Sequence, residues 1–408
     1  MKEITTVGLD LAKNVFQVHA VDAAGAVVVR RQLRRAQVQL FFSRLAPCLI
    51  GIEACAGAHY RARTTGRALP GAHYRARELA KLGHEVRLIP PSYVKPFVRR
   101  GKTDAADAEA ICTAVVQPTM RCVPVKTEVR QAVLMSHRTR DFLVRQLTRL
   151  ANAIRAHLGE FGPRGPWLGR NPPPEGFVRA SPHPSPSVVP KGVHTMGRLV
   201  AEAEAADLPA EARMPLDLLV GQFADTKARI DAITNDLRRA AEADETARRL
   251  QTMPGIGPIT ASVLAATLPD VSAFRSAVAS GRLDRWRDPL ATLPAWLGLT
   301  PKPHSSGGKE RLGAISKMGN RCIRRLLYLG AMGVISTCKR TDPGEDGLGR
   351  MLGKKPLKVV AIALANRMAR QIWAFAMGLE PWRPHGSPEN GRGLAGRVTA
   401  MNSGPCAA

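Results

Sequence analysis

The sequence has no long apolar segment and no closely spaced pair of cysteines. No apolar run approaches the roughly 18 residues of a membrane-spanning helix. The chain also runs from Met1 directly into a strand pattern. We therefore expect a cytoplasmic, nucleoid-associated bacterial protein with no membrane partner. The seven cysteines are scattered and include no C-x-x-C pair. This excludes the usual zinc and redox signatures and predicts reduced, mostly buried thiols.

Acidic residues are also scarce. Asp and Glu total 33 against 60 Lys and Arg, so the 408-residue chain has a formal charge of +27 and an isoelectric point near 10.8. The excess is spread along the chain, which favours a partner rich in phosphate, such as nucleic acid. A solvated basic surface or a ribosome-associated protein is the alternative. The length allows two or three domains.

Two of the few acids stand three residues apart in a helix-favouring stretch, residues 102–111. Asp104 and Asp107 would project from one face of that helix. Carboxylates held this close repel each other unless a cation lies between them, and oxygen ligands suit Mg²⁺ or Mn²⁺. A solvated helix face is the alternative for this pair taken alone.

Two further acids fall at the ends of predicted strands. Strand patterns cover residues 4–11, 15–21, 26–29, 48–54 and 85–90, with the first three forming a meander. Asp10 ends the first strand and Glu53 ends the fourth. If these two strands are adjacent and parallel, both carboxylates emerge at one edge of the sheet, where Asp104 and Asp107 can join them. Four such acids suit two-metal phosphoryl transfer.

The order G-L-D at 8–10, I-E-A at 52–54 and K-T-D-x-x-D-A at 102–108 resembles a known family. It is similar to the RuvC-like (ribonuclease H-like) DEDD domain of insertion-sequence transposases that act as bridge-RNA-guided DNA recombinases. The resemblance implies an α/β domain over residues 1–122. It also implies that the metal-binding catalytic acids are Asp10, Glu53, Asp104 and Asp107.

A short tandem duplication interrupts this domain. The stretch GAHYRAR occurs at 57–63 and again at 71–77. With a period of 14 and no third copy, it is not a solenoid repeat. Pro70 favours a loop for the first copy. His59 or His73 as a metal ligand is possible, although a surface or DNA-facing role is favoured.

A long amphipathic helix is predicted over residues 128–161, and a second over 211–249 after a helical stretch at 193–206. The nine prolines between residues 162 and 191 indicate a linker. Residues 123–161 and 192–249 would form a coiled-coil arm that mediates oligomer contacts, or an intramolecular hairpin. The arginines on the first helix favour contact with a nucleic-acid backbone, with Arg138, Arg145 and Arg149 as candidates, and a solvated helix face is the alternative.

Residues 250–378 form the predicted C-terminal domain, which is mostly helical. P-G-I-G-x-x-x-A at 254–261 indicates a helix-hairpin-helix element, in which Gly255 and Gly257 would let the backbone approach a phosphate. An ordinary tight connection is the alternative. The residues from 277 to 294 are an insert relative to the family, and 379–408 have the composition of a frayed tail.

Within this domain, a loop that contains two serines lies between Lys302 and Arg311 and is flanked by cationic side chains. Ser305 or Ser306 could present a hydroxyl to a phosphodiester, and the stretch alone also suits a phosphate-binding loop. The resemblance implies a nucleophilic serine here, and Ser306 is preferred because it directly precedes Gly307. The surrounding residues predicted to bind nucleic acid are Lys302, His304, Lys309, Arg311 and Lys317.

The resemblance implies a complete reaction. Serine attack on a DNA phosphodiester would form a 5′-phosphoserine, with strand exchange through a Holliday junction. Donor and target DNA would be chosen by a structured non-coding RNA. The protein would act as a homo-oligomer, a dimer or tetramer, in which the acids of one subunit meet the serine of another. The alternatives are a metal-dependent Holliday-junction nuclease and an inactive remnant that only binds nucleic acid.

Overall fold

The computed structural model forms two compact units, residues 1–128 and 129–408, and each is described by itself. The structure describes residues 3–11, 15–54, 71–98, 103–118, 120, 122–161, 197, 201, 208–268, 274, 292–304, 309, 311–340 and 347–378. Within these ranges no helix combines the length and apolar character needed to cross a membrane. All five described cysteines are free, and three of them are buried.

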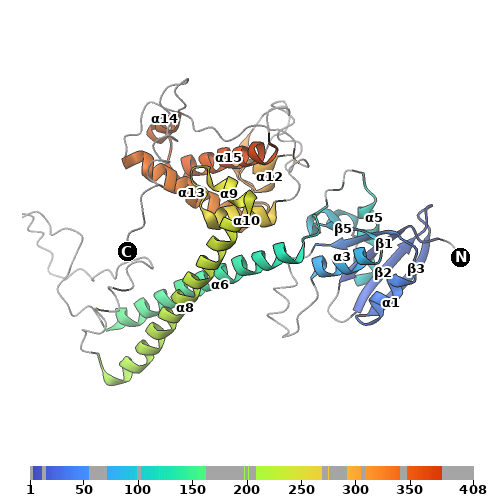
Figure 1. Cartoon of the computed structure of the whole chain (residues 1–408), viewed down its shortest axis with the longest axis horizontal. Coiled ribbons are helices and arrows are strands. Elements are labelled where there is room, and N and C mark those ends of the chain that lie inside the picture. Colours follow the sequence, from blue (N-terminus) through green and yellow to red (C-terminus); the bar gives the residue numbers. More distant parts are fainter. Residues whose placement is uncertain are drawn as a thin grey trace, which may run out of the picture. The chain divides into compact units, whose positions relative to one another are not determined.

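The first unit is built on a five-stranded mixed sheet with the order β3-β2-β1-β4-β5 (Figure 1). The first three strands form the expected antiparallel meander. The pairs β1–β4 and β4–β5 are parallel, which confirms that the first and fourth strands lie side by side. The third strand is longer than the sequence indicated, because its exposed polar half lacks an apolar signal. The strands are β1 (Thr6–Leu11), β2 (Val15–Val21), β3 (Val27–Arg34), β4 (Leu49–Glu53) and β5 (Glu85–Ile89).

Helices cover both faces of this sheet. Residues of α1 (Gln37–Ser43) and α3 (Ala72–Lys81) share one buried cluster with alternate strand residues such as Leu9 and Phe16. The intervening strand residues face α5 (Asp104–Val115), which packs on β1, β2, β4 and β5. Two short turns of helix precede α5, α4 (Pro91–Val94) and η1 (Lys95–Phe97).

Helix α3 begins in the second copy of the duplicated stretch, with Gly71 as its N-cap residue. The first copy, including His59, lies outside the described residues, as do the proline-rich stretch 162–191, most of the predicted helix 193–206 and the tail 379–408. Of the 277–294 insert, residues 292–294 are described; Leu293 begins the short helix α12 (Leu293–Trp296).

In the second unit, α6 (Glu128–Glu160) and α8 (Ala210–Ala243) run side by side (Figure 1). Leucines of α6 share a buried cluster with Leu216, Phe223 and Ile230 of α8. The direction is antiparallel, since Arg140 in the first half of α6 donates a 2.7 Å hydrogen bond to Thr234 in the second half of α8, and Leu158 near the end of α6 lines one pocket with Leu216 near the start of α8. The predicted pairing of the two long helices is therefore present within one chain.

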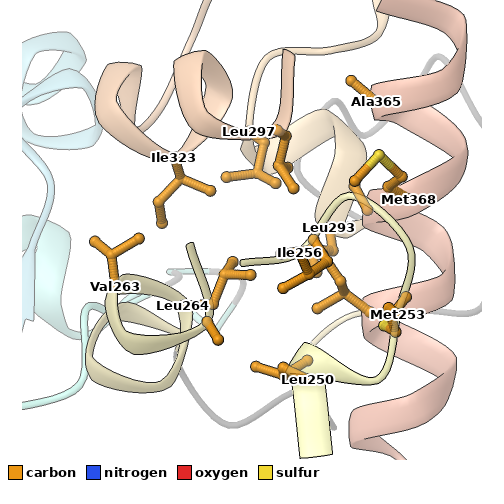
Figure 2. Close-up of a cluster of buried hydrophobic side chains, with 14 of the residues drawn as sticks. Leu250, Met253, Ile256, Val263, Leu264, Leu293, Leu297, Ile323, Ala365 and Met368 are labelled. Atoms are coloured by element: carbon orange, nitrogen blue, oxygen red, sulfur yellow. The ribbon is translucent and has the colours of Figure 1, made fainter. Parts of the chain in front are cut away.

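The main core of the second unit gathers shorter helices around apolar side chains. Figure 2 shows Leu250, Ile256, Leu264 and Met368 converging from different segments. The two-stranded sheet of this unit, β6 (Pro301–Pro303) and β7 (Leu312–Ile315), is antiparallel. The helices of this part are α9 (Glu245–Gln251), α10 (Pro258–Thr267), α12, α13 (Arg321–Arg340), α14 (Gly347–Lys354) and α15 (Leu357–Ala376).

Candidate active site

Two glycines position the acidic residues of the first unit. Gly8 of β1 and Gly51 of β4 are paired across the parallel strands. A Cβ atom on Gly8 would lie 2.1 Å from the carbonyl oxygen of Ala108, and one on Gly51 would lie 2.9 Å from the Cβ of Val115. Only glycine permits so close an approach of helix α5 to the sheet.

The same two glycines fix which face carries the acids. Side chains two residues apart on a strand point to the same face. Asp10 follows Gly8 by two residues, and Glu53 follows Gly51 by two, so both carboxylates lie on the face that α5 covers. They stand at the carboxyl ends of β1 and β4, beside the N-terminal turn of α5.

Helix α5 brings the remaining two acids to this edge. Thr103 caps the helix, since its hydroxyl accepts a 3.2 Å hydrogen bond from the backbone N–H of Ala106. Asp104 and Asp107 occupy the first turn, where the positive end of the helix dipole favours negative charge. The helix starts at Asp104 and not at Lys102 as the sequence suggested, because Thr103 has an extended backbone and serves as the N-cap.

Three of the four predicted acids form one cluster. One carboxylate oxygen from each of Asp10, Asp104 and Asp107 lies within 4.8 Å of the other two. Burial, followed by the charges of Asp107, Asp104 and Glu53, raises the pKa of Asp10 from 3.8 to about 6. Glu53 is thus close enough to act on Asp10 electrostatically, although it is not among the three clustered groups.

The cluster fits a divalent cation. Its donors are hard carboxylate oxygens, which suit Mg²⁺, Mn²⁺ or Ca²⁺ and not the thiolate-seeking metals. The mutual repulsion that raises the pKa of Asp10 would be relieved by a positive charge between the three groups. The residues present therefore match a metal site, and their oxygen chemistry leaves the choice of ion open.

His73 has a different environment from the acids. Its Nδ1 accepts a 3.3 Å hydrogen bond from the backbone N–H of Lys126. This contact ties α3 to the segment before α6 and gives the ring a structural role.

The basic residues predicted on α6 are exposed, and Arg145 among them forms an ion pair. Arg138 and Arg149 are exposed. Arg145 forms a 3.1 Å ion pair with Asp141, which also pairs with Arg325 of α13. One carboxylate therefore orients two guanidinium groups, and the i, i+4 spacing of Asp141 and Arg145 signals the first of these two pairs in the sequence.

The hairpin of β6 and β7 presents the second group of predicted residues. Lys302, His304, Lys309 and Arg311 are all exposed, and the backbone N–H of His304 donates to the carbonyl of Arg311 at 2.8 Å. Ser305 and Ser306 lie outside the described residues, between these flanks.

Exposed Lys317 follows the hairpin. It has a left-handed backbone conformation with φ of 55°, which is uncommon for a residue with a side chain. Its N–H donates to the carbonyl of Gly298 at 3.1 Å, which holds this conformation in place.

The two glycines of the P-G-I-G turn have different surroundings. Gly255 has φ of 81°, and a Cβ there would lie 2.9 Å from the carbonyl oxygen of Gly330 in α13. Close packing against α13 is thus one physical reason for this glycine. Gly257 is the N-cap of α10, is exposed and has no atom within 4 Å of an added Cβ among the contacts described. Of the two, Gly257 has the free surface that a phosphate contact requires.

Sequence reasoning missed Gly8 and Gly51 as parts of this site. The signal is present, because each glycine stands two residues before a strand-terminal acid, as Gly-x-Asp and Gly-x-Glu. Because β1 and β4 are parallel and pair Gly8 with Gly51, the two glycines lie side by side and leave room for a helix.

A mixed sheet with carboxylates gathered at its edge by a crossing helix defines a DEDD nuclease-like domain. Residues 7–163 match a transposase model for the DEDD domain of IS110 elements. Residues 247–343 match the model described as "Transposase IS116/IS110/IS902 family". The chain belongs to this family of transposases, and it is an enzyme that recombines DNA.

Curated relatives span nearly the whole chain. A "Probable family 20 transposase" of Pseudomonas aeruginosa is 42% identical over 93% of this chain and 99% of its own length. The transposase for insertion sequence element IS1328 of Yersinia enterocolitica is 34% identical, covering 91% of this chain and 97% of its own. The transposase for element IS1111A of Coxiella burnetii is 31% identical, covering 94% and 92%.

Proposed function

We propose that this insertion-sequence transposase cuts and rejoins DNA with a divalent metal ion held by Asp10, Asp104 and Asp107, with Glu53 beside them. The observation that supports this most strongly is the approach of three carboxylates to within 4.8 Å. Mg²⁺ is the expected ion, with Mn²⁺ as a substitute that the same oxygen donors accept.

Asp10, Asp104 and Asp107 would hold this ion beside the reacting phosphodiester. When bound, a divalent ion offsets the negative charge on the phosphate and lowers the pKa of a coordinated hydroxyl or water. The residues would hold the ion in a fixed place, because Asp104 and Asp107 are set by the capped helix and Asp10 by the central strand. The DNA strand to be cut binds beside this cluster.

The nucleophile in this proposal is the hydroxyl of Ser306 or Ser305. Its oxygen attacks the phosphorus, the bond to the 3′ oxygen of the leaving strand breaks, and that oxygen takes up a proton. The product is a 5′-phosphoserine and a free 3′ hydroxyl, so strands can be exchanged through a Holliday junction without loss of phosphodiester energy. The exposed cations Lys302, Lys309 and Arg311 support this assignment, since they can offset the charge on the attacked phosphate.

Further parts of the proposal concern partners. Arg138, Arg149 and Lys317 would contact nucleic-acid backbone, and the turn at Gly255 and Gly257 would act as a helix-hairpin-helix. Gly257, which is open, is the better supported glycine. A structured guide RNA would select donor and target DNA. The α6–α8 pair would serve as a coiled-coil arm in a dimer or tetramer, joining acids and serine from different subunits.

Excision of the element from a plasmid that carries it with its natural flanks tests this function. Joined ends of the excised DNA are measured by quantitative PCR at equal protein levels. We expect product from the wild type, none from Asp107→Asn, and none from the double variant Ser305→Ala with Ser306→Ala. Cleavage that survives the double serine change with a covalent protein–DNA link would refute the serine step. Absence of product from the wild type, with DNA and RNA binding intact, would favour a remnant without catalysis.

A further inference from the structure

A row of polar side chains continues from Asp10 across the sheet. Asp10 of β1 is directly paired with Gln17 of β2, and Gln17 is directly paired with Gln32 of β3. Directly paired residues place their side chains on the same face, with Cβ atoms roughly 5 Å apart. All three side chains are therefore on the face that carries the acids, at successive strand positions away from the cluster.

Gln17 lies mostly buried beside Asp10, but its amide reaches the surface, because it is not among the buried polar atoms that lack a partner. Its side chain is only 8% exposed. In the part of the chain that the structure describes, no hydrogen bond uses its amide. The amide therefore stands opposite a predicted metal ligand and is open to a ligand at the surface. Its amide can donate to a phosphate oxygen and accept from a metal-bound water.

Beyond Gln17 the row reaches exposed positions on the edge strand. Gln32 and Arg34 are both exposed and lie two residues apart, so they share the acid-side face of β3. Helix α5 packs mainly on the other four strands. Arg30 shares the face but is paired with Glu109 at 3.2 Å. For Arg34, the described residues supply no acidic partner, so its charge is available to a ligand.

We propose that Gln17, Gln32 and Arg34 form the binding surface for the DNA strand whose phosphodiester the acids act on. The inference rests on the proposed function of the acids and adds a direction to it. The strand would run from the cluster over β2 to the edge of β3. Gln17 would contact the reacting phosphate, and Gln32 and Arg34 would contact its neighbours along the strand. An anionic strand fits because the row leads from a cation site to an arginine.

The test measures DNA binding that depends on the metal site. Binding of a fluorescein-labelled 30-nucleotide DNA single strand to the full chain is followed by anisotropy in Ca²⁺ and in EDTA at matched ionic strength. The dissociation constant in EDTA divided by the dissociation constant in Ca²⁺ isolates the contribution of the acid site from that of the remaining basic surface. The variants are Arg34→Gln and Gln17→Leu. Arg31→Gln is the matched control, because Arg31 is an exposed arginine on the same strand but on the opposite face.

The expected result is a ratio above one for the wild type, reduced about threefold to tenfold by Arg34→Gln, as for loss of one charged phosphate contact. Gln17→Leu should reduce it similarly, and Arg31→Gln should leave it unchanged. Equal ratios for Arg34→Gln and Arg31→Gln would overturn the inference, as would an effect seen with an RNA strand of the same sequence but not with DNA. A wild-type ratio of one would instead refute the metal site itself, and the inference with it.

Discussion

Replacing Gly8 by alanine should open the acid cluster without touching an acid. The added Cβ would lie 2.1 Å from the carbonyl oxygen of Ala108 and 2.5 Å from the backbone nitrogen of Cys112. Carbon and oxygen normally stay at least about 3.3 Å apart. Helix α5 would therefore have to retreat by on the order of 1 Å, because both clashing atoms belong to its backbone.

This displacement has two measurable consequences. Overpacking of this kind costs about 3 kcal/mol, which lowers the melting temperature of a unit of this size by roughly 10 °C. Asp104 and Asp107 move with the helix, so divalent-metal affinity should fall about 10- to 100-fold, as when ligand orientation is lost. Differential scanning calorimetry and calorimetric titration with Mn²⁺ measure the two effects on the same protein.

Gly71→Ala is the matched control, because no atom of the described residues lies within 4 Å of a Cβ built there. It should cost at most about 1 kcal/mol, as for a weakened N-cap, and leave metal affinity unchanged. Gly51→Ala, whose added Cβ would have contacts of 2.9 Å and longer, should have effects on stability and metal affinity between those of Gly8→Ala and Gly71→Ala. If Gly8→Ala binds Mn²⁺ as tightly as the wild type, the glycine pair does not set the position of the acids.

Three further predictions concern charged groups. Asp10→Asn should stabilise the metal-free protein at pH 8 by on the order of 3 kcal/mol. The pKa of Asp10 is raised to about 6 in the folded protein, so Asp10 contributes to stability at low pH and this contribution is lost as the pH rises from 3.8 through 6. Equal melting temperatures of the variant and the wild type at pH 8 would contradict this prediction. Burial and Arg140 lower the pKa of His137 to about 4, so its contribution is present above pH 6.5 and lost as pH falls toward 4. In pH-dependent denaturation His137→Gln should flatten the stability profile in that window, and an unchanged profile would count against the buried neutral ring. Asp141→Asn should destabilise the second unit by about 1 kcal/mol and tighten DNA binding measured by anisotropy, since it releases Arg145 and Arg325; weaker binding would argue that the carboxylate orients them for DNA.

Much of the first unit was predictable because its strands carry period-two apolar patterns and its acids stand at strand ends. Asp10 and Glu53 could be placed at one edge once the first and fourth strands were assumed parallel, and the register of β1 with β4 confirms that assumption. Asp104 and Asp107 followed from helical spacing. These inferences depend on local periodicity and on the rule that the carboxyl ends of neighbouring parallel strands meet at one edge of the sheet.

The glycine pair and Gln17 could not be found in this way. Their roles depend on which residues face each other across strands, and the sequence alone does not fix that register. Arg145 was read as a free cation because its spacing to Asp141 was not used. Gly255 was read as a phosphate contact, and its packing against Gly330 depends on a helix some 75 residues further along the chain.

The most direct test of the central claim is a calorimetric titration of Mg²⁺ into the full-length protein at pH 7.5. The account predicts saturable binding to the wild type and its loss in Asp107→Asn. Binding should be retained in Glu109→Gln, since that acid lies on the same helix but pairs with Arg30. Absence of binding to the wild type, or binding that survives both Asp10→Asn and Asp107→Asn, would contradict the assignment of these acids as a metal site.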